Sequence, residues 1–366
     1  MNNTYTVISY NNYEVKLMVF LMRDKKPYLI FEEFIEKINI NSFTSDLEKD
    51  KLAAQVSDAF DRSIKVSKAR DKNVYLVFDA HNYFYDSKTF NFDFTDEHVV
   101  TMSDVQKVFK HSMTSENVKS GFIPIHFQIN KFFNQDNKAI PNPIGSSVTK
   151  LGVTGELVFS DSNTFYNVKD IIETYDIKVI DSIVGGYLLN DVINLDDNHG
   201  LMEISTDRIN FAVNTDGENK QFSVEMGFRK ILESVYEKLI ESHNYEDSEG
   251  AVRFLMEYFP IKEYDSEFYV VGDIKLNDLI AVFNHVIIDY FNYIFEQLNK
   301  QNINCTMFNV ILHDYVSHDF VCLLNKNLSI TFVEYKNADY KNVDFANLKA
   351  YLAASAFYEK NIQVYE

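Results

Sequence analysis

Cysteine, tryptophan and long apolar runs are scarce or missing in this chain of 366 residues. The two cysteines, Cys305 and Cys322, lie in apolar sequence without a partner motif, so we interpret them as core residues rather than as a disulfide or a zinc site. No apolar run approaches the roughly eighteen residues of a membrane-spanning helix. The amino terminus lacks the basic start and the apolar centre of a signal peptide. We therefore expect a soluble, cytoplasmic protein.

Positive charge is also in short supply. The chain has 35 basic and 54 acidic side chains, and its formal net charge of −19 would repel a polyphosphate backbone, which argues against nucleic-acid binding. It contains no Gly-x-Ser-x-Gly, Walker, His-Glu-x-x-His or Cys-x-x-Cys motif, which argues against the common enzymes. The pairs His313-Asp314 and His318-Asp319 recur five residues apart. We interpret them as loop residues after a strand and predict no metal site.

Hydrophobic residues, at 46% of the chain, are plentiful enough to form two or more compact domains. Two β-rich segments with a central turn, Tyr5–Phe20 and Gly200–Val213, predict one hairpin at the start of each half of the chain, and so a duplicated α/β architecture. Hydrophobic periodicity predicts helices over 46–69, 167–175, 228–242, 251–258, 276–300 and 345–357, and strands over 73–79, 178–184, 221–227, 263–271 and 308–312. The aromatic stripe of the 276–300 helix is more typical of a core than of a partner groove.

The segment 82–160 has a different pattern, which indicates an inserted module. It begins with short aromatic strands over 83–94, and the spacing of Thr101 and Asp104 predicts a helix that starts with a capping box. Two alternating apolar runs, 123–127 and 153–159, flank a centre rich in asparagine, proline and glycine. By itself this pattern indicates a strand, a long turn and a second strand, as in a surface hairpin of any α/β protein.

The order of these parts resembles the inserted subdomain, called 1C, of the bacterial cell-division protein FtsA. The resemblance rests on Ile125, His126, Phe132, Asp136, Ile140, Pro143, Ile144, Gly145, Leu151, Leu157 and Val158. It implies a two-lobed, actin-like (ribonuclease H-like, duplicated) α/β fold with an FtsA-type insertion. The first lobe would comprise 1–81 and 161–190, the 1C subdomain 82–160, the second lobe 191–242 and 300–366, and a small subdomain 243–299.

The resemblance also implies where a nucleotide would bind, because this family holds ATP with glycine-rich turns that let backbone N–H groups approach phosphate oxygens. The glutamine and proline that close the first half correspond to Gly185 and Gly186. A carboxylate about 4 Å from a phosphate costs roughly 4 kcal/mol at an effective dielectric near 20. We therefore expect a degenerate pocket with no catalytic residue, no cofactor and no ATP hydrolysis. The pocket positions are Ser9, Asn11, Asn12, Glu14, Glu203, Ser205, Thr206, Asp207, Gly227, His313 and Asp314. If this alignment is shifted by a residue or two, the alternative is an active actin-like ATPase that binds ATP and Mg²⁺ and forms filaments, of the plasmid-segregation or pilus-assembly type.

FtsZ is the partner that the resemblance implies, with the protein recruited to the division site at the inner face of the cell membrane. The FtsZ tail is commonly apolar with basic residues, so acidic side chains near the small subdomain would complement it. The candidate contacts are Glu241, Glu246, Asp247, Glu249, Asn284 and His285. We also expect self-association through the 1C subdomain, and a separate membrane-tethering partner, because no basic amphipathic helix follows the last predicted helix.

Overall fold

The computed structural model describes most of the chain in two compact units. The described residues are 4–10, 14–37, 46–68, 71–80, 83–114, 119–192, 199–204, 209–215, 218–224, 226–243, 270–271, 274–300, 303, 305–312, 318–334, 343 and 345–365. Unit 1 comprises Met1–Val192 and Asn347–Glu366, and unit 2 comprises Ile193–Ala346. None of the described helices is long and apolar enough to cross a membrane.

A five-stranded sheet forms the centre of unit 1. Its strands are β1 (Thr4–Tyr10), β2 (Glu14–Arg23), β3 (Lys26–Lys37), β4 (Asn73–Phe78) and β9 (Lys178–Val184), in the order β3-β2-β1-β4-β9. The hairpin predicted at the start of the chain is confirmed, since Tyr5 pairs with Phe20 across antiparallel β1 and β2. Strands β4 and β9 run parallel to β1. Strand β3 escaped prediction because charged residues interrupt its apolar alternation.

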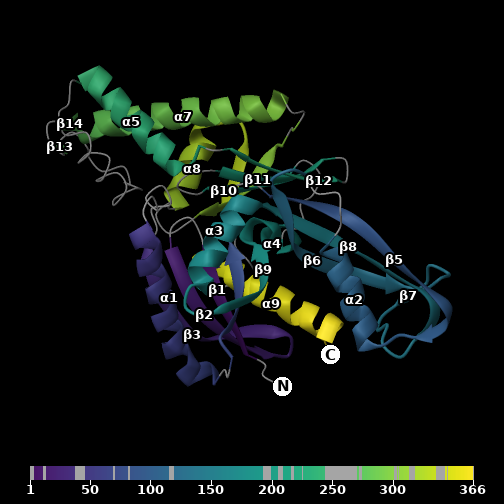
Figure 1. Cartoon of the computed structure of the whole chain (residues 1–366). Coiled ribbons are helices and arrows are strands. Elements are labelled where there is room, and N and C mark those ends of the chain that lie inside the picture. The colour runs from purple at the N-terminus through teal and green to yellow at the C-terminus, as the bar shows by residue number, and fades with distance from the viewer. Residues whose placement is uncertain are drawn as a thin grey trace. The chain divides into compact units, whose positions relative to one another are not determined.

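Helices cover both faces of this sheet. Strand β4 alternates its side chains between the two faces. One face packs against α9 (Phe345–Tyr365), where Tyr75 contacts Phe357, and the other against α3 (Ser162–Glu173), where Phe78 contacts Phe165. Helix α3 in turn packs against α1 (Asp46–Ser67). Figure 1 shows α9, in yellow, beside β1 and β9. The assignment of 300–366 to the second lobe was therefore wrong for the last helix, because its aromatic residues pack on the sheet of unit 1.

The inserted segment of unit 1 forms its own antiparallel sheet and hydrophobic core. Its strands are β5 (Tyr83–Val99), β6 (Phe122–Phe133), β7 (Ala139–Ile140) and β8 (Ser147–Asp161), in the order β5-β8-β6-β7. The predicted short aromatic strands are in fact one strand of 17 residues, because β8 pairs along its length. Helix α2 (Met102–Ser112) begins with the predicted capping box between Thr101 and Asp104. Gly145 has φ of +83°, which glycine adopts readily.

Unit 2 repeats the topology of the first sheet. Its strands β10 (His199–Ile204), β11 (Ile209–Thr215), β12 (Glu218–Val224), β15 (Met307–Leu312) and β16 (Thr331–Glu334) have the order β12-β11-β10-β15-β16. Each strand corresponds in pairing and direction to one of unit 1, so the duplication predicted from the two hairpins is confirmed. A two-stranded ribbon, β13 (Val270–Val271) and β14 (Ile274–Lys275), precedes α7.

The described helices of unit 2 are α5 (Phe228–His243), α7 (Leu276–Lys300) and α8 (His318–Asn327). They follow the short helix α4 (Gly185–Val192), which belongs to unit 1. Phe283 and Phe291 of α7 are fully buried, which confirms that its aromatic stripe belongs to a core. Cys305 is half-buried, whereas Cys322 is exposed on α8, so the interpretation of Cys322 as a core residue was wrong. The predicted helix 251–258 lies outside the described residues.

Candidate functional site

The carboxyl ends of parallel strands are where open α/β sheets generally bind ligands. In unit 1 these ends are the last residues of β1, β4 and β9, and Asp79 follows β4 directly. The backbone N–H of Asp79 donates to the carbonyl of Tyr10, which holds the end of β4 beside the end of β1. A ligand of this sheet would therefore meet the Asp79 carboxylate.

A buried lysine forms an ion pair with the Asp79 carboxylate. Lys349 of α9 places its Nζ 2.8 Å from Oδ1 of Asp79, and the two side chains are only 6% and 9% exposed. A hydrated magnesium ion needs carboxylate oxygens as direct or water-mediated ligands. Here the Asp79 carboxylate is already paired with the Lys349 ammonium. Among the described residues, no group of three histidine, cysteine or acidic side chains could hold a metal.

Two glycines make room for this arrangement. A Cβ added to Gly185 would lie 2.7 Å from Cδ of Lys349 and 2.9 Å from Oδ1 of Asp79. A Cβ added to Gly186 would lie 2.6 Å from the hydroxyl oxygen of Tyr83. A side chain at either position would therefore collide with the ion pair or with Tyr83, a steric reason for glycine that the sequence did not reveal.

The other predicted pocket positions are divided between the units. Ser9 is buried in β1 of unit 1, and Glu14 begins β2, although its side chain lies outside the described residues. In unit 2, the buried Glu203 of β10 accepts a hydrogen bond from Nδ2 of Asn210 at 3.0 Å. Gly227 lies directly before α5, and its carbonyl accepts from the backbone N–H of Lys230. The remaining predicted positions, Asn11, Asn12, Ser205, Thr206, Asp207, His313 and Asp314, lie outside the described residues.

The predicted partner residues that can be placed lie on α5 and α7 of unit 2. A pocket of about 410 Å³ lies between these helices and is lined by Ser234, Glu237, Lys238, Glu241, Val286, Asp289 and Tyr290. Glu241 is exposed and pairs with Lys238 at 3.5 Å, while His285 pairs with Asp289 at 3.3 Å. Three carboxylates and one lysine give this lining an acidic character. Asn284 is half-buried on α7, and Glu246, Asp247 and Glu249 lie outside the described residues.

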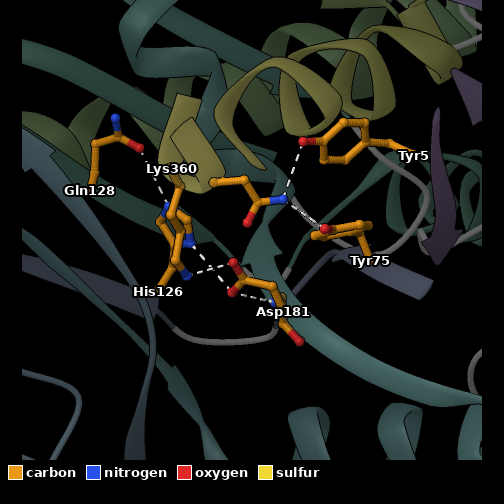
Figure 2. Close-up of polar contacts among 8 residues, drawn as sticks. Tyr5, Tyr75, His126, Gln128, Asp181 and Lys360 are labelled. Atoms are coloured by element: carbon orange, nitrogen blue, oxygen red, sulfur yellow. Dashed lines mark hydrogen bonds and ion pairs between the residues drawn. The ribbon is translucent and has the colours of Figure 1, made fainter. Parts of the chain in front are cut away.

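A buried polar network, which the sequence did not predict, joins three elements of unit 1 (Figure 2). Asp181 of β9 accepts a hydrogen bond from the ammonium of Lys360 on α9, and its Oδ1 also accepts from the backbone N–H of Ser182. Nδ1 of His126, on β6, lies 3.7 Å from the same Oδ1, and Nε2 lies 3.4 Å from Oε1 of Gln128. The network therefore connects the core sheet, the inserted sheet and the last helix.

Burial sets the electrostatics of this network. It lowers the pKa of His126 below 6.5, and the charge of Lys360 lowers that pKa further, against an opposing effect of Asp181. Burial raises the pKa of Asp181, but Lys360 and His126 outweigh burial and hold that pKa below its ordinary value. The pKa of Lys360 is lowered by burial despite Asp181. The arrangement is thus a buried carboxylate–ammonium pair beside an imidazole whose pKa is lowered. The one sign of this network in the sequence was the charged Asp181 among the apolar residues of β9.

Comparisons with known proteins identify the fold. The sequence matches no protein-family model and no curated protein. A chain in the solved PilM-PilN type IV pilus biogenesis complex is similar in structure, with a TM-score of 0.52, 9% sequence identity, and coverage of 100% of this chain and 99% of that chain. The ethanolamine utilization protein EutJ of Carboxydothermus hydrogenoformans has a TM-score of 0.48 and 7% identity, covering 97% and 89%. MreB 5 of Spiroplasma citri bound to AMPPNP has a TM-score of 0.46 and 9% identity, covering 98% and 97%. The repeated five-stranded sheet and the likeness to the PilM-PilN structure show that the chain has an actin-like α/β fold.

Proposed function

We propose that this protein is a non-enzymatic scaffold of the actin fold, which binds the cell-division protein FtsZ and helps to organise or anchor the division ring at the inner face of the cell membrane. The Asp79–Lys349 ion pair carries the non-enzymatic part of the proposal. It removes the free carboxylate that a magnesium nucleotide would need at the carboxyl ends of β4 and β9. The protein would then bind no cofactor.

The acidic pocket between α5 and α7 supports the choice of partner. Its lining has three carboxylates and one lysine, beside the apolar surfaces of Val286 and Tyr290. A peptide tail with apolar and basic residues would complement both properties, and complementary charge would accelerate the encounter. Because the inserted segment resembles the FtsA 1C subdomain, we take FtsZ as the source of such a tail. The same resemblance suggests that the inserted segment is the surface for self-association. In the PilM-PilN complex an actin-fold protein likewise assembles with a second protein. A separate membrane-tethering partner completes the proposed role.

Equilibrium binding of a fluorescent FtsZ tail peptide tests the partner. We expect a dissociation constant of tens of micromolar or below, and a loss of about tenfold when Glu237 and Glu241 are both changed to glutamine. Changing Asp93 and Asp96 to asparagine alters the net charge equally at exposed positions of β5 and is the matched control. No binding at tens of micromolar, or equal losses in both double variants, would remove FtsZ as the partner of this pocket.

An active ATPase of the same fold is the second candidate. The buried Glu203 at the end of β10 favours it, because a carboxylate there could bind Mg²⁺ through water. Thermal melting with and without millimolar Mg-ATP separates the two functions, since a ligand of the native state raises the melting temperature by mass action. An unchanged melting temperature supports the scaffold, whereas a rise of several degrees that requires Mg²⁺ supports the ATPase.

A further inference from the structure

A cavity of unit 1 lies away from the carboxyl ends of the strands of the core sheet. It has a volume of about 740 Å³ and is lined by Thr4, Tyr5, Tyr75, Phe109, Met113, Pro124, Ile125, Phe165, Lys169, Val179, Ile180, Asp181, Ser182, Lys360 and Asn361. Its strand residues come from the amino-terminal half of β1 and β4, from β6 of the inserted sheet, and from β9, which is an edge strand of the core sheet. The cavity is therefore a separate place from the Asp79–Lys349 pair and from the pocket of unit 2.

The ammonium of Lys360 has hydrogen-bonding capacity left in this cavity. The Lys360 side chain is 6% exposed and has three N–H donors, of which Asp181 accepts one. The Phe109 ring lies 4.2 Å from the nitrogen and stabilises positive charge without accepting a conventional hydrogen bond. Lys169, which is partly exposed on α3, also lines the cavity, and its Nζ lies 3.8 Å from Oε2 of Glu173.

We infer that this cavity binds the carboxylate of an aromatic or aliphatic acid, with Lys360 as its main polar contact. The rest of the lining is mostly tyrosine, phenylalanine, methionine and aliphatic side chains, which would cover the apolar body of the acid. A volume of about 740 Å³ lies within the range of ordinary small-ligand sites, roughly 300–1,000 Å³. The site does not depend on the proposed scaffold role.

His126 would couple this binding to a proton. Four groups surround its ring: Asp181 of β9, Lys360 and the Phe357 ring of α9, and Gln128 of its own strand. Nδ1 of His126 is buried and has no hydrogen-bond partner among the residues that the structure describes. A ligand carboxylate on Lys360 would add negative charge nearby and raise the lowered pKa of His126, so binding would take up a proton. By linkage, the affinity for the acid should rise as the pH falls toward the lowered pKa of His126, as long as the acid's own carboxylate, with a pKa of about 4–5, stays ionised.

Calorimetric titration of the full chain tests the chemistry of the ligand. The probes are 4-phenylbutyrate and its uncharged amide, and we expect the acid to bind at least tenfold more tightly. A second pair, acetyl-Leu-Phe with a free or an amidated carboxyl end, distinguishes a peptide terminus from a small free acid as the source of the carboxylate. A preference for the acid in either pair supports the site. Equal binding of acid and amide in both pairs, or no binding of either acid at 10 mM, overturns it.

Variants test where the acid binds and which residue takes up the proton. Replacing Lys360 alone would leave the buried Asp181 carboxylate without its cation. The informative variant therefore combines Lys360→Met with Asp181→Asn, and circular dichroism checks its fold. We expect this variant to lose at least tenfold in affinity for the acid, and the control Lys110→Met, exposed on α2, to lose none. Titrations in two buffers of different ionisation enthalpy should show proton uptake in the wild type and none in His126→Gln. Unchanged affinity in the double variant overturns the site, and proton uptake that persists in His126→Gln overturns the coupling.

Discussion

Replacing Lys349 with methionine should destabilise unit 1 strongly. Methionine keeps the unbranched stem that packs beside Gly185 but removes the ammonium 2.8 Å from Asp79. The carboxylate, only 9% exposed, would then be buried without its cation. Removing one partner of a buried ion pair costs about 3–5 kcal/mol, because the remaining charge has lost its water as well as its partner. Domains are stable by about 5–15 kcal/mol, so this loss is a large part of the total.

A double-mutant cycle shows whether the pair itself is responsible. Changing Asp79 to asparagine in the Lys349→Met background removes the stranded charge while keeping the size of the side chain. We expect the double variant to recover about 2 kcal/mol or more of what the lysine variant lost, as coupled neighbours do. Because the sequence has no tryptophan, unfolding by urea is best followed by circular dichroism. A loss below about 1 kcal/mol in Lys349→Met, or a double variant no more stable than the single one, would refute this account of the pair.

Three further changes test other parts of unit 1. The free energy of unfolding should fall as the pH falls through 6.5, because buried His126 has a lowered pKa and the unfolded chain therefore binds a proton first. His126→Gln should flatten this part of the pH profile, measured by urea unfolding. Thr101→Ala should lower the free energy of unfolding by about 1 kcal/mol, because it removes the side chain that accepts from the backbone N–H of Asp104 at the start of α2. Thr149→Ala on β8 is the surface control in the same thermal melts. Gly155→Ala should destabilise the inserted sheet by about 1–3 kcal/mol, since its Cβ would lie 2.2 Å from the carbonyl oxygen of Gln128, and soluble yield and melting temperature report the effect.

Local sequence patterns were sufficient for much of the fold. Alternating apolar residues around a short turn predicted both hairpins, and the duplication followed from their likeness. The threonine–aspartate spacing predicted the start of α2, because a capping box forms between residues three apart. The bounds of α7 and β9 also agree with prediction, since a helix of 25 residues and a buried strand both have strong periodicity. Strand β3 and the short helix α4 were missed, because neither has a clear period.

The sites depended on packing between distant segments. Asp79 and Lys349 are 270 residues apart, and Asp181 and Lys360 are 179 residues apart. Both pairs exist because α9 packs on the sheet of unit 1, whereas its place in the sequence suggested the second lobe. The sequence determined which segments become strands and helices, because that information is local. Which buried charges meet depends on the packing of distant segments, because a lysine on a helix gives no local sign of the carboxylate that it will neutralise.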